Sequence, residues 1–367
     1  MKICIWITKI FDLGGTKRVV SLLANELVKE HEVTIMTYED RFREDRTMYH
    51  LSEDINVDFI DNSQFVNKHH TPAFCARYLV KKLNDRSGLF NKKSLNPILA
   101  EAIFPQKTRE KWVEYFNSQD YDVILTTASL SLRLAMIAPR LKAATIGWQH
   151  NCYDGYLHVK PVVFWQQENL LQQYLPNLDR YIVLSDYDKR DYMEKLGIDC
   201  EVKINPRSFV SEKKCDVKSK RFLMATRFVY AKGLDLMMES FEEFCKEDSE
   251  WELDIIGDGD LFDQIRADAK KRHLEKRVHF VGYTNEPEKY YLNSSVFLLP
   301  SRWEGWPMVI MEAFEFGLPV IAYHMGAMDL IIDDGKTGFL PEAFDPHKFA
   351  QAMLKLAHDE ELRARMS

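Results

Sequence analysis

The chain has 367 residues, which is too long for one ordinary hydrophobic core and predicts two domains. Hydrophobic residues make up 46% and charged residues 29% of the sequence, so we expect a compact chain that stays in solution. The net charge of −7 argues against a general nucleic-acid-binding protein.

The sequence shows no sign of secretion or of membrane insertion. The first residues, MKICIWITKIFDLGG, are too polar after Thr8 for a signal peptide, and no apolar run approaches ~18 residues. The six cysteines form no CxxC motif, and no histidine pair has zinc-ligand spacing, which favours scattered buried thiols in a reducing cytoplasm. We therefore expect a cytoplasmic protein, and a peripheral position at the inner face of the plasma membrane stays open.

Strands and helices alternate along the first half of the chain. KICIWI is predicted as a strand, Gly14 and Gly15 interrupt the chain, and TKRVVSLLANELVKE has helical periodicity. A helix is expected from about Ser129, and Gly197 should end another helix over DYDKRDYMEKLG. The other predicted strands are HEVTIMT, YDVILTT, AATIGW, DRYIVLS and CEVKIN. This alternation predicts a parallel sheet with helices on both faces.

A polar segment without strong periodicity, residues 205–220, is interpreted as the linker between domains. The alternation then restarts with predicted strands RFLMATRF, WELDIIG, RVHFVG, VFLLP and PVIAY and with helices over KGLDLMMESFEEFCKE, over GDLFDQIRADAKKRH and after Trp306. We predict an α/β fold of two doubly wound Rossmann-like domains, residues 1–205 and 206–367, that face each other across a cleft. In such sheets, ligands bind beyond the carboxyl ends of the strands.

Two glutamates flank a loop that turns into a helix. Glu304 follows a strand end, and Glu312 is expected about two turns into the helix. Gly305 lets backbone amides approach a ligand, and the start of a helix favours an anion. One carboxylate can then accept bonds from sugar hydroxyls while amides hold phosphate oxygens. The alternative is that Glu304 caps the helix and Glu312 is solvated, although apolar residues flank Glu312.

Two cations and two glycines are the next candidates. Arg227 follows a strand and Lys232 opens the next helix, where a diphosphate would need them; the alternative is two surface cations. Gly14 and Gly15 precede a helix and form a close-approach anion loop. Neither GGTKRV nor GDGDLF completes the dinucleotide-binding glycine fingerprint.

Two further candidates have structural alternatives. Asp258 and Asp260 form a DxD pattern typical of a metal site, but we expect one of them to cap the following helix. His150 follows a predicted strand of the first domain, in WQHN. A lone histidine is usually structural, yet its place at a strand's carboxyl end favours a site residue.

EGWPMVIME resembles the E-x7-E motif of the retaining glycosyltransferases of family 4, which have the GT-B fold. FDLGGTKRVV, WQHN, INP, RFVYAKGLD, IIGDGD, VHFVGY and GKTGFL occur in the order and spacing of that family. The resemblance covers essentially the whole chain and is more specific in the second half. It implies an acceptor-binding domain over residues 1–205 and a nucleotide-sugar-binding domain over residues 206–367.

The resemblance also implies a role for each matching residue. Arg227 and Lys232 would bind the donor diphosphate, Glu304 would contact the donor sugar, and Glu312 would contact the ribose. His150 would lie beside the transferred sugar. The remaining implied contacts are Gly14 and Gly15 with the distal phosphate, Trp306, Pro307, Met308 and Val309 with phosphate and sugar, and Gly282 and Tyr283 with the nucleobase.

Three features depart from the family pattern. Lys17 stands where an acidic residue is common, which adds positive charge near the phosphates. Residues 61 to about 115 form an expanded acceptor-side region without a matching pattern. The sequence stops at EELRARMS, where such folds usually continue into a helix that crosses back to the first domain; a truncation or a shortened family member would explain this.

The function implied by the resemblance is retaining transfer of a hexose or N-acetylhexosamine, from a UDP-sugar to a glycan or lipid-linked glycan. We find no carboxylate nucleophile at a strand end of the first domain, so the family's front-side displacement is the expected mechanism. Neither a metal ion nor a cofactor is required. The alternatives are a sugar-nucleotide epimerase of the same fold and a non-catalytic nucleotide-sugar-binding module. The missing glycine fingerprint disfavours an NAD-dependent oxidoreductase.

A basic segment with interleaved apolar residues lies in the first domain. Residues 68–93 contain seven basic residues and one acidic residue, a net charge of +6 in a chain of net −7. Such a segment is attracted to an anionic membrane surface. The alternative is a solvated helix whose apolar face packs on the domain. The membrane hypothesis predicts a lipid-linked acceptor at the cytoplasmic face.

Overall fold

The structure is a computed structural model that describes all residues except 40, 48, 62, 64, 66–70 and 160–162. The chain divides into two compact units, Met1–Pro206 and Arg207–Ser367, here called unit 1 and unit 2. Each unit is an α/β domain built on a parallel sheet, which confirms the predicted fold class. Each unit is therefore described by itself.

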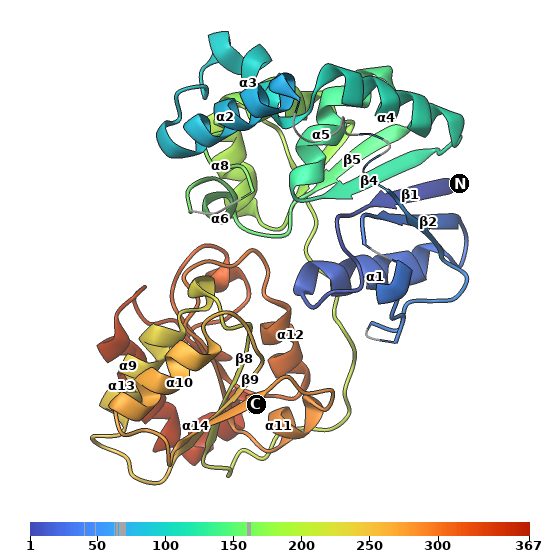
Figure 1. Cartoon of the computed structure of the whole chain (residues 1–367). Helices are drawn as coiled ribbons and strands as arrows, with labels where there is room; N and C mark the ends of the chain where they lie inside the picture. Colours follow the sequence, from blue (N-terminus) through green and yellow to red (C-terminus); the bar gives the residue numbers. More distant parts are fainter. Residues whose placement is uncertain (40, 48, 62, 64, 66–70, 160–162) are drawn as a thin grey trace. The chain divides into compact units, whose positions relative to one another are not determined.

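Unit 1 contains a seven-stranded parallel sheet in the order β3-β2-β1-β4-β5-β6-β7 (Figure 1). The strands are β1 (Lys2–Trp6), β2 (Glu32–Thr37), β3 (Asn56–Phe59), β4 (Val123–Thr127), β5 (Ala144–Trp148), β6 (Arg180–Val183) and β7 (Glu201–Val202). The sequence pattern missed β3, because this edge strand is only partly buried and lacks a strong apolar run. The strand predicted over CEVKIN shrinks to the two residues of β7.

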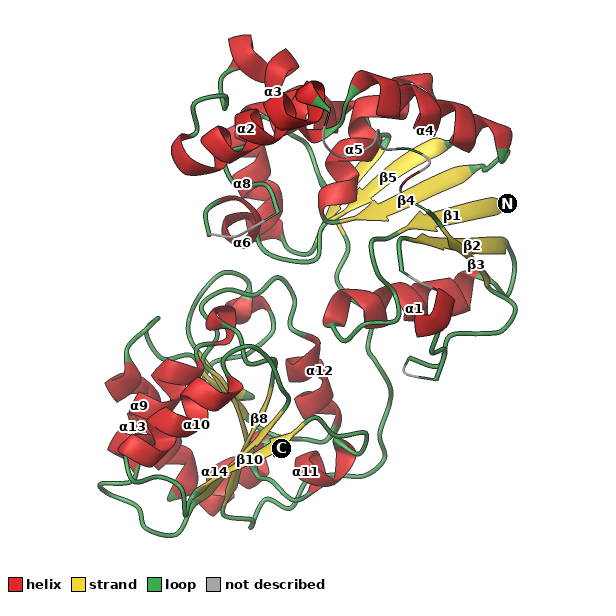
Figure 2. Cartoon of the chain, in the orientation of Figure 1, coloured by secondary structure: helices red, strands yellow, loops and turns green. Residues whose placement is uncertain are grey.

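Helices cover both faces of the unit 1 sheet, with α1 on one face and α4 and α5 on the other (Figure 2). The strand periodicity explains this, because Ile3 and Ile5 point away from Cys4 and Trp6. Trp112 of α4 is stacked on Phe65, with ring centroids 3.9 Å apart. The helices are α1 (Gly15–Leu27), α2 (Pro72–Ser87), α3 (Asn96–Ile103), α4 (Gln106–Ser118), α5 (Ser129–Ile137), α6 (Tyr153–Leu157), α7 (Glu168–Tyr174) and α8 (Asp186–Leu196).

Unit 2 contains a six-stranded parallel sheet in the order β10-β9-β8-β11-β12-β13. The strands are β8 (Arg221–Ala225), β9 (Glu252–Ile256), β10 (Val278–Gly282), β11 (Val296–Leu299), β12 (Val320–Ala322) and β13 (Gly338–Phe339). β8 and β11 are neighbours at the centre of the sheet, although about 70 residues separate them along the chain. The loops that follow these two strands therefore emerge side by side.

Two hydrophobic clusters cover the two faces of the unit 2 sheet. One contains buried residues of α9, α10 and α13, and the other contains buried residues of α11 and α12. The helices are α9 (Leu234–Phe244), α10 (Phe262–Lys271), α11 (Glu288–Leu292), α12 (Met308–Glu315), α13 (Pro346–Ala357) and α14 (Glu360–Met366). None of the described helices is both long and apolar enough to span a bilayer.

The segment predicted as a linker is irregular up to the start of β8. Its second part belongs to unit 2, because the Cys215 amide donates to the Phe316 carbonyl and the Asp216 amide donates to the Leu292 carbonyl. Phe209 also packs against Phe316, with ring centroids 5.5 Å apart. The segment is irregular, as the linker prediction expects. Much of it packs on unit 2, however, and so belongs to that unit.

Candidate functional site

An ion pair at the carboxyl edge of the unit 2 sheet joins two of the predicted site residues. The Nζ atom of Lys232 lies 2.6 Å from Oε1 of Glu304, and the Ser301 hydroxyl donates to the same oxygen at 2.7 Å. The Glu304 side chain is 10% exposed and that of Lys232 is 21% exposed. Because two donors converge on one oxygen, the Glu304 carboxylate is held in a fixed orientation. Its second oxygen, Oε2, is not part of this arrangement.

The loop after β8 and the loop after β11 are held together beside this ion pair. Gly233 has a φ of +63°, and a β-carbon there would lie 2.0 Å from the Pro300 carbonyl oxygen, so no side chain fits. The Arg302 amide donates to the Ala231 carbonyl at 2.7 Å. This close approach brings Lys232 and Glu304, 72 residues apart in sequence, into contact.

Arg302 fixes the same junction through its side chain. Its guanidinium donates to both oxygens of Asp235, at 2.8 and 2.6 Å, and lies 4.0 Å from the Tyr230 ring centroid. Burial raises the pKa of Asp235, but the hydrogen bonds and charge of Arg302 outweigh this and lower the pKa overall. Sequence reasoning missed both Ser301 and Arg302, although both directly follow the strand end VFLLP that led to Glu304.

Glu312 is a buried carboxylate with two hydroxyl donors. It is 7% exposed and accepts hydrogen bonds from Ser208 at 3.3 Å and from Tyr291 at 3.1 Å. The solvated alternative is therefore wrong. Because α12 begins at Met308, Glu312 is the fifth residue of the helix, about one turn in, and the prediction of two turns is also wrong.

Glu304 does not cap α12. The N-cap residue of this helix is Pro307, which has no side-chain cap, and Trp306 and Pro307 lie in the loop before it. Met308 and Val309 form the first turn of α12. The structure therefore removes the capping alternative for Glu304 and leaves its carboxylate to Lys232 and Ser301.

Arg227 lies two residues beyond β8 and is exposed. Within the described part of the chain, its guanidinium makes no ion pair or hydrogen bond, in contrast to Lys232. Gly282 ends β10 with a φ of +78°, and the following Tyr283 is 52% exposed. A cation and an aromatic ring thus stand at the strand ends of unit 2, where both are accessible.

Asp258 and Asp260 are not helix caps. Asp258 accepts a hydrogen bond from the amide of the adjacent Gly259 at 2.7 Å, and α10 begins later, with Leu261 at its N-cap position. The capping expectation is wrong, because the helix starts further along than the pattern indicated. Nowhere among the described residues do three or more His, Cys, Asp or Glu side chains gather as a metal site would require.

In unit 1, the glycine loop is shaped by a carboxylate that the sequence did not reveal. Gly15 is the first residue of α1, and the Gly14 amide donates to the Tyr49 hydroxyl at 2.8 Å. Glu39 is 8% exposed and accepts hydrogen bonds from the amides of Ile10 and Phe11, at 2.5 and 2.9 Å. Glu39 therefore fixes the loop between β1 and α1, and it lies in no recognisable motif.

His150 lies two residues after β5 in unit 1. Its ring centroid is 4.3 Å from that of Trp148, and both ring nitrogens are buried and have no hydrogen-bond partner among the described residues. Burial lowers the pKa of His150 to about 3, so the imidazole is neutral near pH 7. A neutral imidazole can donate from one ring nitrogen and accept at the other.

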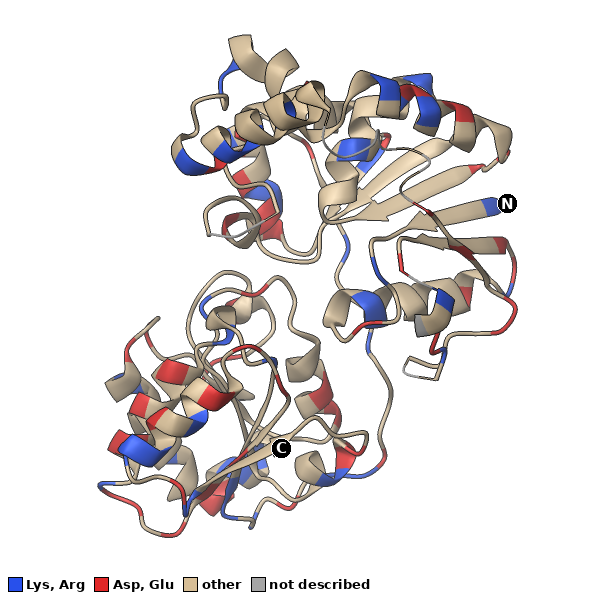
Figure 3. Ribbon diagram, in the orientation of Figure 1, with Lys and Arg blue, Asp and Glu red and all other residues tan. Residues whose placement is uncertain are grey.

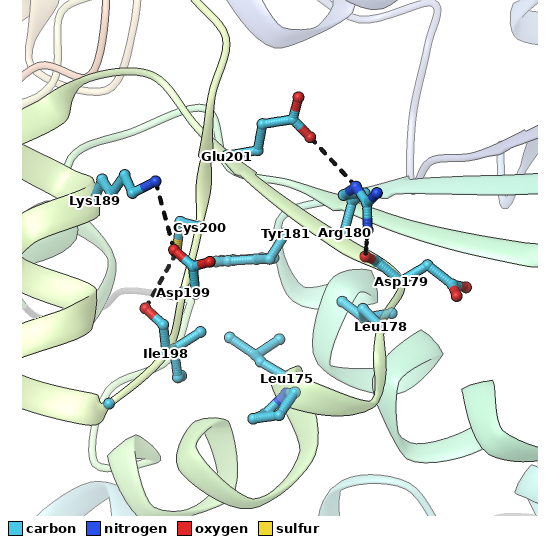
Figure 4. A pocket seen from close by; sticks show the side chains of 12 residues that line it. Leu175, Leu178, Asp179, Arg180, Tyr181, Lys189, Ile198, Asp199, Cys200 and Glu201 are labelled. Carbon is cyan, nitrogen blue, oxygen red and sulfur yellow. Dashed lines mark hydrogen bonds and ion pairs between the residues drawn. The ribbon is translucent and has the colours of Figure 1, made fainter.

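One pocket of unit 1 lies at the opposite end of the sheet from the glycine loop and His150. This pocket, of about 450 Å³, lies at the amino ends of β6 and β7 (Figure 4). Its charges pair with each other, Lys189 with Asp199 at 3.5 Å and Arg180 with Glu201 at 3.6 Å. None of the predicted site residues lines it, so it has no part in the candidate site.

Comparison with protein families identifies the chain. The model described as Glycosyltransferase Family 4 matches residues 13–208, and the model described as Glycosyl transferases group 1 matches residues 208–367. The chain belongs to glycosyltransferase family 4. The boundary between the two matches falls close to the division between unit 1 and unit 2.

Three curated relatives of this glycosyltransferase have related names. An uncharacterized glycosyltransferase of Haemophilus influenzae is 26% identical over 252 residues, 67% of this chain and 69% of its own length. A poly(ribitol-phosphate) alpha-N-acetylglucosaminyltransferase of Staphylococcus aureus is 27% identical over 55% of this chain and 41% of its own length. An Escherichia coli UDP-Gal:alpha-D-GlcNAc-diphosphoundecaprenol alpha-1,3-galactosyltransferase is 33% identical over 29% of this chain and 28% of its own length. The last two matches span less than half of the relative.

Two solved structures resemble this glycosyltransferase over its whole length. A mutant of TarM from S. aureus, in complex with fondaparinux, alpha-GlcNAc-glycerol and UDP, has a TM-score of 0.76 and 16% identity, with 100% of this chain and 94% of TarM covered. Sucrose-phosphate synthase from Thermosynechococcus elongatus has a TM-score of 0.75 and 17% identity, with 100% and 92% covered. At such low identity the likeness shows the shared GT-B fold alone.

We predict that Arg227 and Lys232 of unit 2 bind the diphosphate of a nucleotide. Arg227→Ala and Lys232→Ala should each weaken UDP binding about tenfold or more, because a charge-assisted contact contributes about 1.5–3 kcal/mol. Lys232→Ala also leaves Glu304 without its ion-pair partner, so Arg227→Ala is the simpler probe. Titration calorimetry with UDP measures both.

Lys213→Ala is the matched control, because Lys213 is an exposed cation of unit 2 that pairs with the exposed Glu288. Its UDP affinity should equal that of the wild type. Unchanged affinity in both the Arg227 and the Lys232 variants would contradict the diphosphate assignment.

Proposed function

We propose that this glycosyltransferase is a retaining enzyme that moves a hexose or N-acetylhexosamine from a UDP-sugar to a glycan or lipid-linked glycan acceptor in cell-surface polysaccharide synthesis. The observation that carries the proposal is the Lys232–Glu304 ion pair, fixed by Ser301 at the carboxyl ends of β8 and β11. It joins a group that can bind a diphosphate to a group that can bind sugar hydroxyls. Unit 2 is accordingly the donor-binding domain in this proposal, and unit 1 binds the acceptor.

The donor assignment rests on three kinds of group at the edge of one sheet. Arg227 is exposed and available for a diphosphate, which a guanidinium binds well. Glu312 can accept a ribose hydroxyl in place of the 3.3 Å hydrogen bond from Ser208, which is long for two oxygens. Two of the relatives transfer galactose from UDP-Gal or N-acetylglucosamine, according to their names, which supports a UDP-linked hexose or N-acetylhexosamine here.

The ion pair suits the chemistry of transfer. When the donor binds, its diphosphate attracts the Lys232 ammonium, and sugar hydroxyls donate to the Glu304 carboxylate. The positive charge of Arg227 and Lys232 then stabilises the negative charge that develops on the leaving diphosphate. Positioning by a pre-formed loop reduces the entropic part of the barrier.

In the proposed front-side displacement, the acceptor hydroxyl attacks the anomeric carbon on the face from which the UDP leaves. The bond from the anomeric carbon to the acceptor oxygen forms as the bond to the phosphate oxygen breaks. The proton of the acceptor hydroxyl passes to the leaving phosphate, so no protein carboxylate is needed as a nucleophile. His150, neutral near pH 7, would hydrogen-bond the transferred sugar without adding charge.

Incubation with radiolabelled nucleotide sugars, with and without lipid-linked glycan acceptors, tests the proposed function. We expect acceptor-dependent transfer from a UDP-sugar, with the anomeric configuration retained in the product by NMR. Conversion of the donor alone would favour a sugar-nucleotide epimerase. Binding of UDP without either reaction would favour a non-catalytic module, and an inverted product would contradict the proposed mechanism.

Removal of the Glu304 carboxylate should nearly abolish transfer. Glu304→Ala loses the contact with the donor sugar, and kcat/KM should fall more than about tenfold, a loss above ~1.4 kcal/mol. The matched control is Glu286→Ala, because Glu286 is exposed and pairs with Lys289 within the same surface turn. Circular dichroism should show an intact fold in both variants. Retention of more than about a tenth of wild-type kcat/KM by Glu304→Ala would show that its role is different.

Transfer should continue in the presence of EDTA. Arg227, Lys232 and the start of α12 together provide the positive potential that many transferases obtain from a divalent cation. Initial rates are to be measured with EDTA, and again after addition of excess magnesium or manganese. Complete loss of activity that either metal restores would instead assign a metal-binding role to Asp258 and Asp260.

A further inference from the structure

Helix α2 is a well-capped helix on the surface of unit 1. The Thr71 hydroxyl accepts the Phe74 amide at its start, Pro72 occupies the first turn, and Gly88 ends the helix with a φ of +65°. A glycine is favoured at the end, because this left-handed conformation is strained for other residues. Both ends of the helix are therefore capped by its own flanking residues.

Hydrogen bonds near the carboxyl end of α2 attach the helix to the rest of unit 1. The Asn84 amide donates to the Gln166 carbonyl at 2.7 Å, and the Trp165 indole donates to the Asp85 carbonyl at 2.9 Å. Asn84 is the only described residue of the helix that is fully buried. Val80 packs against the core of unit 1, whereas Tyr78, Leu79 and Leu83 remain exposed.

The outward face of α2 combines apolar and cationic side chains. Tyr78, Leu79 and Leu83 are 59%, 55% and 39% exposed. Residues 78, 79, 82, 83 and 86 follow one another at helical spacing, so Lys82 and Arg86 share this face with them. The alternative in which the apolar face packs on the domain holds for Val80, which packs against the unit 1 core, but not for Tyr78, Leu79 and Leu83, which face outward.

The charge of this region is strongly positive. Among the described residues 71–93 there are six basic residues, Arg77, Lys81, Lys82, Arg86, Lys92 and Lys93, and one acidic residue, Asp85, a net charge of +5. Lys68, part of the segment singled out in the sequence, lies outside the described residues. Figure 3 shows blue Lys and Arg positions recurring along α2. Leu89 and Ile98, after α2 and on the neighbouring α3, are also exposed apolar residues.

We propose that α2 and the turn after it, residues 71–93, form a docking surface for an anionic lipid membrane. An anionic surface complements the net charge of +5, and insertion of Tyr78, Leu79 and Leu83 between lipid head groups buries side chains that the domain leaves exposed. A soluble polyanion would complement the cations but would leave these apolar side chains in water. The combination of both kinds of side chain on one helical face therefore favours the membrane.

This inference goes beyond the proposed function, because it concerns where the protein binds and not the reaction. Co-sedimentation of the full chain with phosphatidylcholine vesicles, with and without phosphatidylglycerol, tests it at low salt. We expect binding only when phosphatidylglycerol is present, and weaker binding as the salt concentration rises.

Two double variants separate the contributions of charge and of apolar insertion. Lys82→Glu with Arg86→Glu, and Leu79→Ser with Leu83→Ser, should each reduce binding to the anionic vesicles at least about tenfold. The control is Lys270→Glu with Lys271→Glu, which makes the same charge change at exposed positions of α10 in unit 2. Its vesicle binding should equal that of the wild type. UDP affinity should be unchanged in all three, which shows that they are folded and keeps this test separate from that of the proposed function.

Two results would overturn the proposal. One is equal, negligible binding of the wild type to both kinds of vesicle. The other is binding that the leucine variant retains, that the charge variant loses and that soluble polyglutamate displaces, because this would assign the surface to a soluble polyanion.

Discussion

The arrangement of unit 2 depends on a close approach between two loops of its central strands. The Pro300 carbonyl oxygen at the end of β11 occupies space that a β-carbon at position 233 would need, so the turn before α9 tolerates only glycine. Arg302 then reinforces the approach through its backbone bond to Ala231 and its ion pair with Asp235. A partly buried ammonium and carboxylate are brought into contact as a result. Such a pair is favourable when its geometry is good and a further hydrogen bond satisfies the carboxylate, as Ser301 does here.

The two glutamates of the motif have different environments, although they lie eight residues apart on one loop and helix. Glu304 is held by a cation and a hydroxyl at the sheet edge, whereas Glu312 accepts hydrogen bonds from the Ser208 and Tyr291 hydroxyls and is flanked by buried apolar residues of α12. The long bond from Ser208 leaves Glu312 able to accept a further hydroxyl. The difference explains how one motif can serve two parts of a nucleotide sugar in the proposed function.

Unit 1 contains a loop that is held by hydrogen bonds and a buried histidine whose ring nitrogens make none with the described residues. Its glycine loop is fixed by Glu39, while His150 keeps two buried ring nitrogens without a partner among the described residues. A buried polar group without a partner is costly, so it is expected where a ligand completes the hydrogen bonds. On the surface, α2 leaves the apolar side chains of Tyr78, Leu79 and Leu83 exposed to water, and we infer that a lipid surface covers them.

The sequence by itself determined the fold class, the two units and most of the strands. These features follow from local apolar runs and from glycines at chain breaks, which need no knowledge of distant residues. It also selected Glu304, Arg227 and Lys232 as candidates, because residues that follow buried strands meet at one edge of a parallel sheet. Glu312 was selected because apolar residues flank it in the predicted helix.

Only the tertiary structure decided which of these residues touch. The pairing of Lys232 with Glu304 and the burial of Glu312 under Ser208 and Tyr291 join segments 72 and 104 residues apart, and no local pattern encodes such contacts. The weakly patterned edge strand β3 and the buried carboxylate of Glu39 were missed for the same reason. The outward orientation of the apolar face of α2 was likewise undecided, because the helical period defines a face but does not state what lies against it.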